Sequence, residues 1–148
     1  MYKRQIVDGV LYGADELVAS WVKERLGSSG KVSEPFAALG ICNRDETGLG
    51  AGLIFHSYQD GADVTLTVAS EGPVARPRAI ARCLSYAFDQ LGLRRVSAEI
   101  ELSNARSIRL AKGLGFVQEG VKRKAAKDGG HVAVMGLLRK DFRLKRYL

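Results

Sequence analysis

Three side chains of this sequence are candidates to accept a proton in a reaction, namely His56, Glu71 and Asp128. The ordinary pKa of histidine, about 6.5, suits proton transfer from an amine near neutral pH. His56 falls late in a predicted strand, where a histidine is more often structural, so both interpretations stay open. Ser, His and Asp residues do not show the spacing of a nucleophile elbow, which argues against a covalent hydrolase.

Asn104 and Ser107 form an Asn-x-x-Ser pair directly after another predicted strand. Asn104 is a good N-cap, because its side-chain oxygen can accept a hydrogen bond from a backbone N–H in the first turn of a helix. We expect that helix to end at Gly115 in the left-handed conformation, which glycine adopts without steric cost. Phe116 is then expected to start the next strand with its ring in the core.

Hydrophobic patterns predict the elements that hold these residues. Period-two alternation between turn residues predicts strands, and apolar stripes at helical spacing predict helices. The strands are expected over residues 6–12, 36–42, 50–58, 63–69, 96–102, 116–125 and 131–139, and the helices over 14–26, 76–91 and 104–113. Strands that alternate with helices across 63–125 indicate a single α/β domain.

Length and composition are those of one soluble domain. The chain has 148 residues, of which 46% are hydrophobic and 26% are charged, enough for one sizeable core. No segment has the length of a membrane span or the pattern of a signal peptide, so we expect a cytoplasmic protein. Cys42 and Cys83 are far apart and have no neighbours at metal-ligand spacing, so we expect reduced thiols and no metal site.

The first five residues, Met-Tyr-Lys-Arg-Gln, look foreign to the rest of the chain. They match the in-frame translation of a transposon-adapter end that is common in sequencing libraries. We therefore expect 1–5 to be a non-native scar and the domain to span 6–148.

The formal net charge is +7, and Lys and Arg are concentrated in 122–124 and 139–146. A basic surface can attract a nucleic acid, an anionic coenzyme or an acidic protein, and charge alone does not choose among them. The basic segments lack the interleaved aromatic residues of a single-strand binding groove, so a solvated basic face is the plain alternative.

The run 104–116, an Asn-x-x-Ser helix that ends in Leu-Gly-Phe, is followed by Glu119-Gly120. It resembles the C-terminal half of the acyl-CoA-binding core of GNAT (Gcn5-related) N-acetyltransferases. The likeness covers about 63–139 and is greatest to the RimJ/RimL branch and to short GNAT-like proteins of phages. It implies the GNAT fold, an α/β fold whose mixed, mostly antiparallel sheet has two splayed central strands and flanking helices.

The resemblance implies an N-acyltransferase, in the first instance an acetyltransferase. An amine acceptor, either a small molecule or a protein, would attack the thioester of acetyl-CoA or another acyl-CoA directly. The donor would lie against Leu66 and Val68, with a backbone N–H near Val68 holding the oxyanion. Asn104 would hydrogen-bond the pantetheine arm or order the loop near it, the alternative being that it serves only as the N-cap. Ser107 would contact the donor and either protonate the departing thiolate or stabilise its charge, because Ala111 stands where many members carry a tyrosine. The alternative is a plain serine on the helix surface.

The sequence departs from the family pattern at the phosphate loop. Family members hold the CoA pyrophosphate on bare N–H groups of a loop of the Arg/Gln-x-x-Gly-x-Gly/Ala type. The matching segment 71–76, Glu-Gly-Pro-Val-Ala-Arg, has one glycine, and its proline lacks an N–H. We expect Arg76 and Arg78 to compensate as charge-assisted anchors, the alternative being arginines that serve only solubility.

Two other functions stay open. Mom-type phage relatives modify adenine in DNA, and both the altered loop and the +7 charge would suit DNA as a partner. DNA binding with a steep salt dependence would indicate that function. A GNAT-fold binding module without turnover is the other alternative, which a folded chain that binds no acyl-CoA would indicate. Dimers are common in the family, so the resemblance also suggests a homodimer.

Overall fold

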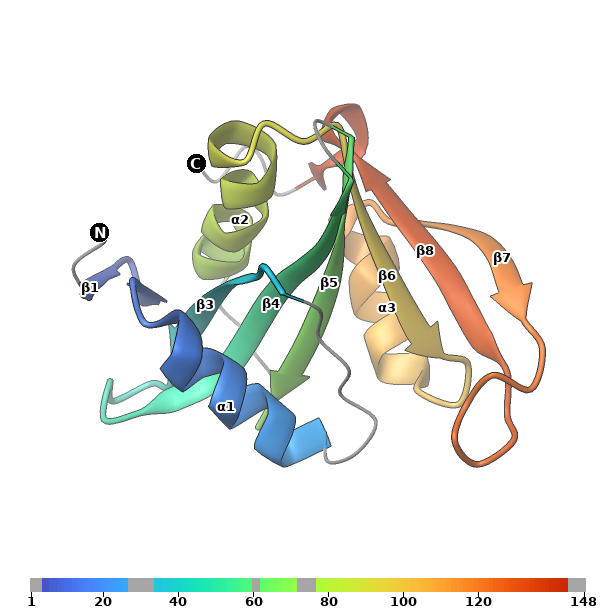
Figure 1. The fold of residues 1–148 in the computed structure, drawn as a ribbon, viewed down its shortest axis with the longest axis horizontal. Helices are drawn as coiled ribbons and strands as arrows, with labels where there is room; N and C mark the ends of the chain where they lie inside the picture. The colour runs from blue at the N-terminus through green and yellow to red at the C-terminus, as the bar shows by residue number, and fades with distance from the viewer. Residues whose placement is uncertain (1–3, 27–33, 60–61, 72–76, 144–148) are drawn as a thin grey trace.

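Eight strands form one sheet in the computed structural model, which describes residues 4–26, 34–59, 62–71 and 77–143 (Figure 1). The strands are β1 (Gln5–Val7), β2 (Val10–Tyr12), β3 (Ala37–Cys42), β4 (Leu49–Gln59), β5 (Asp63–Ser70), β6 (Arg95–Glu101), β7 (Val117–Lys122) and β8 (Val132–Leu138). The helices are α1 (Asp15–Leu26), α2 (Pro77–Ser85) with a π-helical extension (Tyr86–Gln90), α3 (Ala105–Leu114) and a 3₁₀ turn (Arg139–Asp141).

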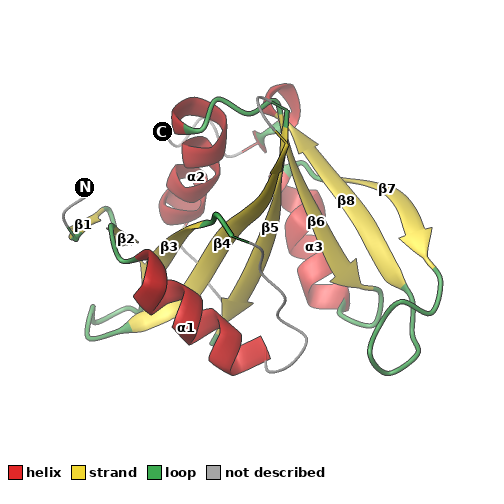
Figure 2. Cartoon of the chain, in the orientation of Figure 1, coloured by secondary structure: helices red, strands yellow, loops and turns green. Residues whose placement is uncertain are grey.

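The strand order is β1-β2-β3-β4-β5-β6-β8-β7, and β5 and β6 form the parallel pair of a sheet whose other neighbours are antiparallel. A parallel pair needs a crossover connection, which α2 supplies, and helices flank the sheet on both sides (Figure 2). The mixed, mostly antiparallel α/β sheet predicted from the sequence is therefore confirmed.

The two faces of the sheet are covered by different helices. We call the side under α1 the front face, because Val18 and Val22 of α1 pack there with Ile54 of β4. On the back face α2 and α3 share one larger core with alternate strand residues, such as Phe55 and Val96. Side chains alternate along a strand, so β4 and β5 contribute to both cores.

The N-terminal segment differs from its prediction. Instead of one strand over 6–12, the chain forms a hairpin in which β1 and β2 are joined by Asp8 and Gly9. These two residues have φ of 52° and 79°, the pair of positive values that a two-residue I′ turn requires. Gln5, placed outside the domain by the sequence prediction, starts β1 and pairs with Tyr12.

Two further boundaries are corrected. The strand predicted over 116–125 ends at Lys122, and Lys124 has a φ of 56° in the loop that follows. The helix predicted over 76–91 leaves α-helical geometry after Ser85 and continues as a π-helix to Gln90. The predicted loop over 27–30 lies outside the described residues.

Both predicted ends of α3 are confirmed. The Asn104 side-chain oxygen accepts the backbone N–H of Ser107 at 3.2 Å, which is an N-cap. Gly115 has a φ of 112°, and a Cβ there would lie 2.0 Å from the carbonyl oxygen of Asp141. Glycine is thus required both by conformation and by close backbone approach, and Phe116 follows with its ring buried.

Candidate functional site

The parallel strands β5 and β6 pair at one end and separate at the other. Their ladder consists of three pairs, Asp63↔Arg95, Val64↔Val96 and Thr65↔Ser97. Beyond these pairs β5 continues along β4 to Ser70, and β6 continues along β8 to Glu101. We call this divergence the V (Figure 1). It divides the sheet into an N-terminal half-sheet, β1–β5, and a C-terminal half-sheet, β6–β8, as the splayed fold predicts.

The inner edges of the V present backbone hydrogen-bonding groups. The N–H of Glu71 donates to Gly50 of β4 at 2.8 Å, and backbone groups alternate in direction along a strand. The N–H and C=O of Val68 therefore point away from β4, toward β6. The N–H of Arg95 donates to Ala62 at 3.0 Å, so the backbone of Glu99 points toward β5 by the same alternation. No ladder joins these edges within the described residues, which leaves both available to an extended ligand.

Leu66 and Val68 both direct their side chains to the back face. Leu66 is buried in the core that α2 covers. Val68 remains 46% exposed, although it lies within a strand in the middle of the sheet. An exposed apolar side chain beside the V provides a surface for the hydrocarbon part of a ligand.

Asn104 and Ser107 lie at the open end of the V, because α3 follows the carboxyl end of β6. The Asn104 oxygen is occupied by the cap, whereas the Ser107 hydroxyl takes no part in it. Ser107 is half-buried and stands one helical turn before Ala111, which packs in the core. The pair therefore lies on the side of α3 that faces the sheet, at its margin.

Of the two predicted phosphate anchors, Arg78 lies within the described residues. Arg76 lies outside the described residues, as do the other residues of 72–76. Arg78 is exposed in the first turn of α2, with its Nε 3.8 Å from a carboxylate oxygen of Asp8. The Nε of Arg82 lies 2.7 Å from the same oxygen. Asp8 thus joins the β1–β2 turn to α2 and partly neutralises Arg78.

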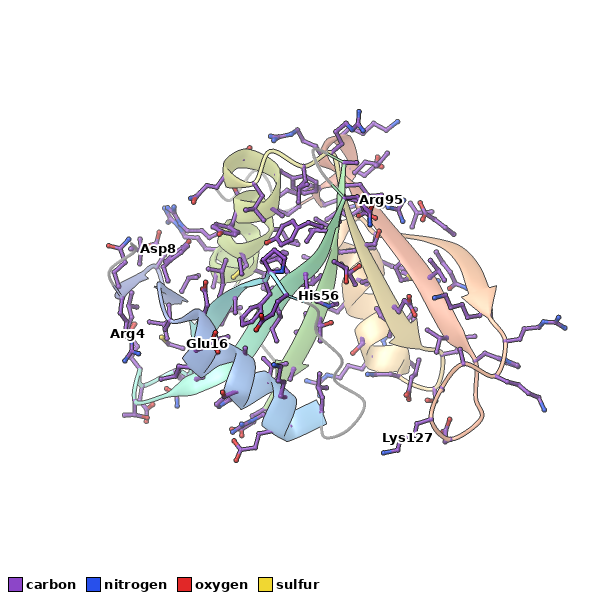
Figure 3. The ribbon with its side chains drawn as sticks, viewed as in Figure 1. Arg4, Asp8, Glu16, His56, Arg95 and Lys127 are labelled. Carbon is purple, nitrogen blue, oxygen red and sulfur yellow. The ribbon has the colours of Figure 1, made fainter. Side chains whose placement is uncertain are left out.

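His56, labelled in Figure 3, is the one buried polar residue of the described chain, with 6% exposure, and alternation from Ile54 places it on the front face of β4. Its Nε2 lies 2.7 Å from Thr67 Oγ1, and its Nδ1 lies 2.9 Å from Ser57 Oγ. Burial lowers the pKa of His56 below its usual value, so the ring is neutral at neutral pH. A neutral imidazole between two hydroxyls can accept a proton at one nitrogen while it donates from the other.

Glu71 lies far from His56. Its carboxylate accepts hydrogen bonds from Arg25 Nε and Nη2 at 2.8 and 2.5 Å, and the guanidinium stacks on Trp21. His56 is paired with Thr65, six residues before Glu71, which corresponds to roughly 20 Å along β5. The two proton acceptors suggested by the sequence therefore do not form one site. The third, Asp128, accepts the N–H of Gly130 in the β7–β8 loop.

Sequence reasoning missed several polar residues near the V. The alternation of Thr65 and Thr67 predicted a strand, and the same alternation places both hydroxyls on the face of His56. The sequence held no signal for the cluster of Asp63, Arg95, Ser97 and Glu119, whose hydrogen bonds join residues up to 34 positions apart.

Two negative findings concern the described part of the chain alone. It contains no group of three or more His, Cys, Asp or Glu side chains that could hold a metal ion. None of its helices is long and apolar enough to cross a membrane.

Comparisons with known proteins fit this geometry. Residues 12–117 match the family described as acetyltransferase (GNAT) domain. No curated protein matches the chain in sequence. The likeness to phage proteins finds no support in these comparisons and stays a prediction.

Solved structures show the same fold at low sequence identity. A ribosomal-protein-S5-alanine acetyltransferase from Vibrio fischeri has a TM-score of 0.69 at 13% identity, over 96% of this chain and 100% of that one. A spermidine N-acetyltransferase from Vibrio cholerae has a TM-score of 0.62 at 15% identity, over 99% and 85%. A GCN5-related N-acetyltransferase from Brucella melitensis has a TM-score of 0.63 at 20% identity, over 86% and 61%. With the family match over most of its length, the chain belongs to the GNAT family of acetyl-CoA-dependent N-acetyltransferases.

Proposed function

We propose that the chain acetylates an amine by direct attack on acetyl-CoA bound in the V. The observation that carries this proposal is the separation of β5 from β6 after three pairs, which leaves backbone groups on two facing edges. The pantetheine arm of CoA contains two amides, which can add to such edges as an extended strand does. Catalysis then consists of positioning and charge stabilisation, without a covalent enzyme intermediate.

The N–H of Val68 is the proposed oxyanion donor. Its direction toward the V is supported by the alternation along β5, and its exposed side chain offers apolar contact to the donor. A preorganised backbone donor stabilises the charge that develops on the thioester oxygen as the amine adds to the carbonyl carbon.

Ser107 is the proposed proton donor to the leaving thiolate. Its hydroxyl lies in the first turn of α3 at the open end of the V and is not used by the N-cap. The C–S bond breaks as the tetrahedral intermediate collapses, and the sulfur takes the proton, which leaves CoA as a thiol.

The positive ends of two helices support phosphate binding. α2 follows β5 in the chain and α3 follows β6, and neither helix has an acidic residue in its first turn. Each carries an arginine there instead, Arg78 and Arg106. Arg76 and Arg78 remain the proposed pyrophosphate anchors, and Arg106 joins them as a further cation for the CoA phosphates.

His56, acting through Thr67, is the proposed acceptor of the amine proton. Thr67 is half-buried, two residues beyond Thr65, the last β5 residue paired with β6. After attack the new C–N bond leaves an extra proton on nitrogen. That proton passes to Thr67 Oγ as the Thr67 proton moves to His56 Nε2, and an amide is formed. Glu71 is the alternative acceptor, and its ion pair with Arg25 makes its carboxylate less available.

The acceptor is proposed to be a small-molecule or protein amine, as in the spermidine and ribosomal-protein acetyltransferases that share the fold. DNA as a partner is less favoured, because several described cations already have acidic partners: Arg25, Arg95, Lys122 and Arg139. Cytoplasmic location and a homodimer stay predictions.

Calorimetric titration of acetyl-CoA into the wild type, Val68→Pro and Val68→Ala tests the site. The N–H of Val68 points away from β4, so proline removes the proposed donor without removing a β4 ladder bond. Val68→Ala keeps the N–H and is the matched control. We expect micromolar binding by the wild type and about 100-fold lower kcat for Val68→Pro than for Val68→Ala, measured as thiol release with an amine panel. No binding by a folded wild type contradicts the proposal and favours a binding module, or DNA if a salt-sensitive complex forms instead.

A further inference from the structure

Four polar side chains form a cluster on the front face where β5 and β6 meet: Asp63, Arg95, Ser97 and Glu119. We call it the apex cluster. The Ser97 hydroxyl lies 2.7 and 2.8 Å from the two carboxylate oxygens of Asp63 and donates to this group. Arg95 Nε donates to Ser97 Oγ at 2.8 Å, and the two terminal nitrogens of Arg95 donate to the two oxygens of Glu119 at 2.8 and 2.6 Å. The cluster therefore connects β5, β6 and β7 across β8.

Gly136 of β8 supplies the space that Arg95 needs to reach Glu119. A Cβ at Gly136 would lie 2.6 Å from Glu119 Oε2 and 2.7 Å from each terminal nitrogen of Arg95. Glycine within a strand is otherwise unfavourable, and it often marks a place where another group approaches the backbone closely. The apex cluster and this glycine therefore form one arrangement.

The position of the apex cluster is the point at which the half-sheets join. Asp63, Arg95 and Ser97 belong to the three residue pairs between β5 and β6. The side chains of Arg95 and Asp63 are 27% and 28% exposed, so solvent screens them less than a fully exposed ion pair. The hydrogen bonds from Arg95 lower the pKa of Glu119, which keeps its carboxylate ionised at neutral pH.

We propose that the apex cluster fixes where the two half-sheets separate and thereby positions the edges of the V against the acyl donor. This rests on the proposed function, in which the donor lies in the V. Because three pairs hold β5 to β6, a small change of angle there moves Val68 relative to Glu99, and hydrogen bonds to one ligand from both edges tolerate little displacement. Asp63, Arg95, Ser97 and Glu119 are positioning residues, since they act through the strands that carry them.

Ser97→Ala and Gly136→Ala test the apex cluster in two independent ways. The first removes the hydroxyl that joins Asp63 to Arg95, and the second displaces the guanidinium without changing a charge. Ser97→Thr keeps the hydroxyl and is the rescue variant. Lys122→Ala is the matched control, because Lys122 joins β7 to Glu99 of β6 at 2.9 Å on the same face, beyond the three pairs.

Two measurements separate this proposal from the proposed function. The first is amide hydrogen exchange of the unliganded proteins at 64–66 and 96–98, and the second is the calorimetric Kd for acetyl-CoA. We expect Ser97→Ala and Gly136→Ala to exchange faster there and to raise Kd about tenfold, the effect of losing one hydrogen bond to the ligand. Ser97→Thr and Lys122→Ala should stay within twofold of wild type in Kd.

Each outcome decides one question. If amide exchange is unchanged in both alanine variants, the apex cluster does not fix where the half-sheets separate. This conclusion holds whether or not acetyl-CoA binds. Faster exchange with an unchanged Kd, or a fall in thermal stability alone, overturns its positioning role. Absence of acetyl-CoA binding by the wild type contradicts the proposed function. The exchange measurement still shows whether the apex cluster fixes the separation of the half-sheets.

Discussion

Two helices, α1 on the N-terminal half-sheet and α3 after the first strand of the C-terminal half-sheet, differ in the charges of their first turns. α1, which packs on the N-terminal half-sheet, has Asp15 and Glu16 in its first turn and Lys23 and Arg25 in its last. This is the distribution that the helix dipole favours. α3, which follows the first strand of the C-terminal half-sheet, has no acidic residue in its first turn and carries Arg106 there. A cation at that end is unfavourable for the isolated helix.

This difference indicates that the charges of α1 and α3 have different roles. The charges of α1 are used within the fold, as in the contact of Arg25 with Glu71 and the ring of Trp21. α1 packs on β3, β4 and β5 of the front face, where Val18 and Val22 form a core with Ile54. The first turn of α3 keeps its positive end unneutralised by its own residues, at the open end of the V. We infer that α1 serves stability and that α3 gives up some stability for an anionic ligand.

Removal of the Ser107 hydroxyl tests whether the α3 side of the V carries the chemistry. Ser107→Ala should lower kcat by about 100-fold, because general acid catalysis contributes at least that much. Its Kd for acetyl-CoA should stay within twofold of wild type, and the backbone N-cap should be retained. Thiol release at saturating acetyl-CoA, with Ser107→Thr as the control that keeps a hydroxyl, measures this. An unchanged kcat would remove Ser107 from the mechanism.

One charge reversal in α3 and one in α1 test whether the first turns of these helices have different roles. Arg106→Glu should raise the stability of the unliganded protein by about 0.3–1 kcal/mol and weaken acetyl-CoA binding about tenfold. Glu16→Lys in α1 should lower stability by a similar amount and leave binding unchanged. Urea unfolding and calorimetry give the two quantities. Equal binding by Arg106→Glu and wild type would show that the first turn of α3 does not meet the CoA phosphates.

The proposed proton acceptor, His56, should make a modest contribution to the pH dependence of stability. Burial lowers the pKa of His56 below 6.5, so the unfolded chain takes up this proton before the folded one does. The contribution of His56 to stability is therefore complete above pH 6.5 and declines as the pH falls below that value, by at most about 1.4 kcal/mol per pH unit.

Urea unfolding at several pH values between about 5 and 8 measures this decline. His56→Gln removes the ionisable group, so its stability should depend less on pH than that of the wild type in this range. The same slope in both proteins would show that another group is responsible. In the activity assay, His56→Gln and Thr67→Val should lose the same acid limb of the kcat/KM profile if the two side chains act together.

Patterns local in sequence predicted most of the fold. The Asn104 cap and the Gly115 terminus of α3 follow from residue chemistry within one helix, and both are confirmed. The hairpin at Asp8 and Gly9 was missed although Asp-Gly is a strong turn signal, because the flanking strands have three residues each. The segment was therefore too short to show two alternations.

The site was less predictable, because the pairing register of the strands decides which of its side chains meet. A bulge in β4 directly follows His56, where Ser57 has a φ of 55° and its hydroxyl lies 2.9 Å from His56 Nδ1, and no turn residue in the sequence indicated it. Ser97 meets Asp63 only because a parallel ladder begins at Asp63↔Arg95. Pairings of this kind follow from the whole sheet rather than from any window of sequence.

The strand order has a consequence for how the chain comes together during synthesis. β8 follows β7 in the sequence but lies between β6 and β7. The N-terminal half-sheet is formed by consecutive neighbours, so it can assemble while later segments are still being made. β6 and β7 gain their antiparallel partner only after residues 132–138, which form β8, have been synthesised. Until then both strands expose unpaired edges, and this interval is when the nascent protein is most open to aggregation or to help from a chaperone.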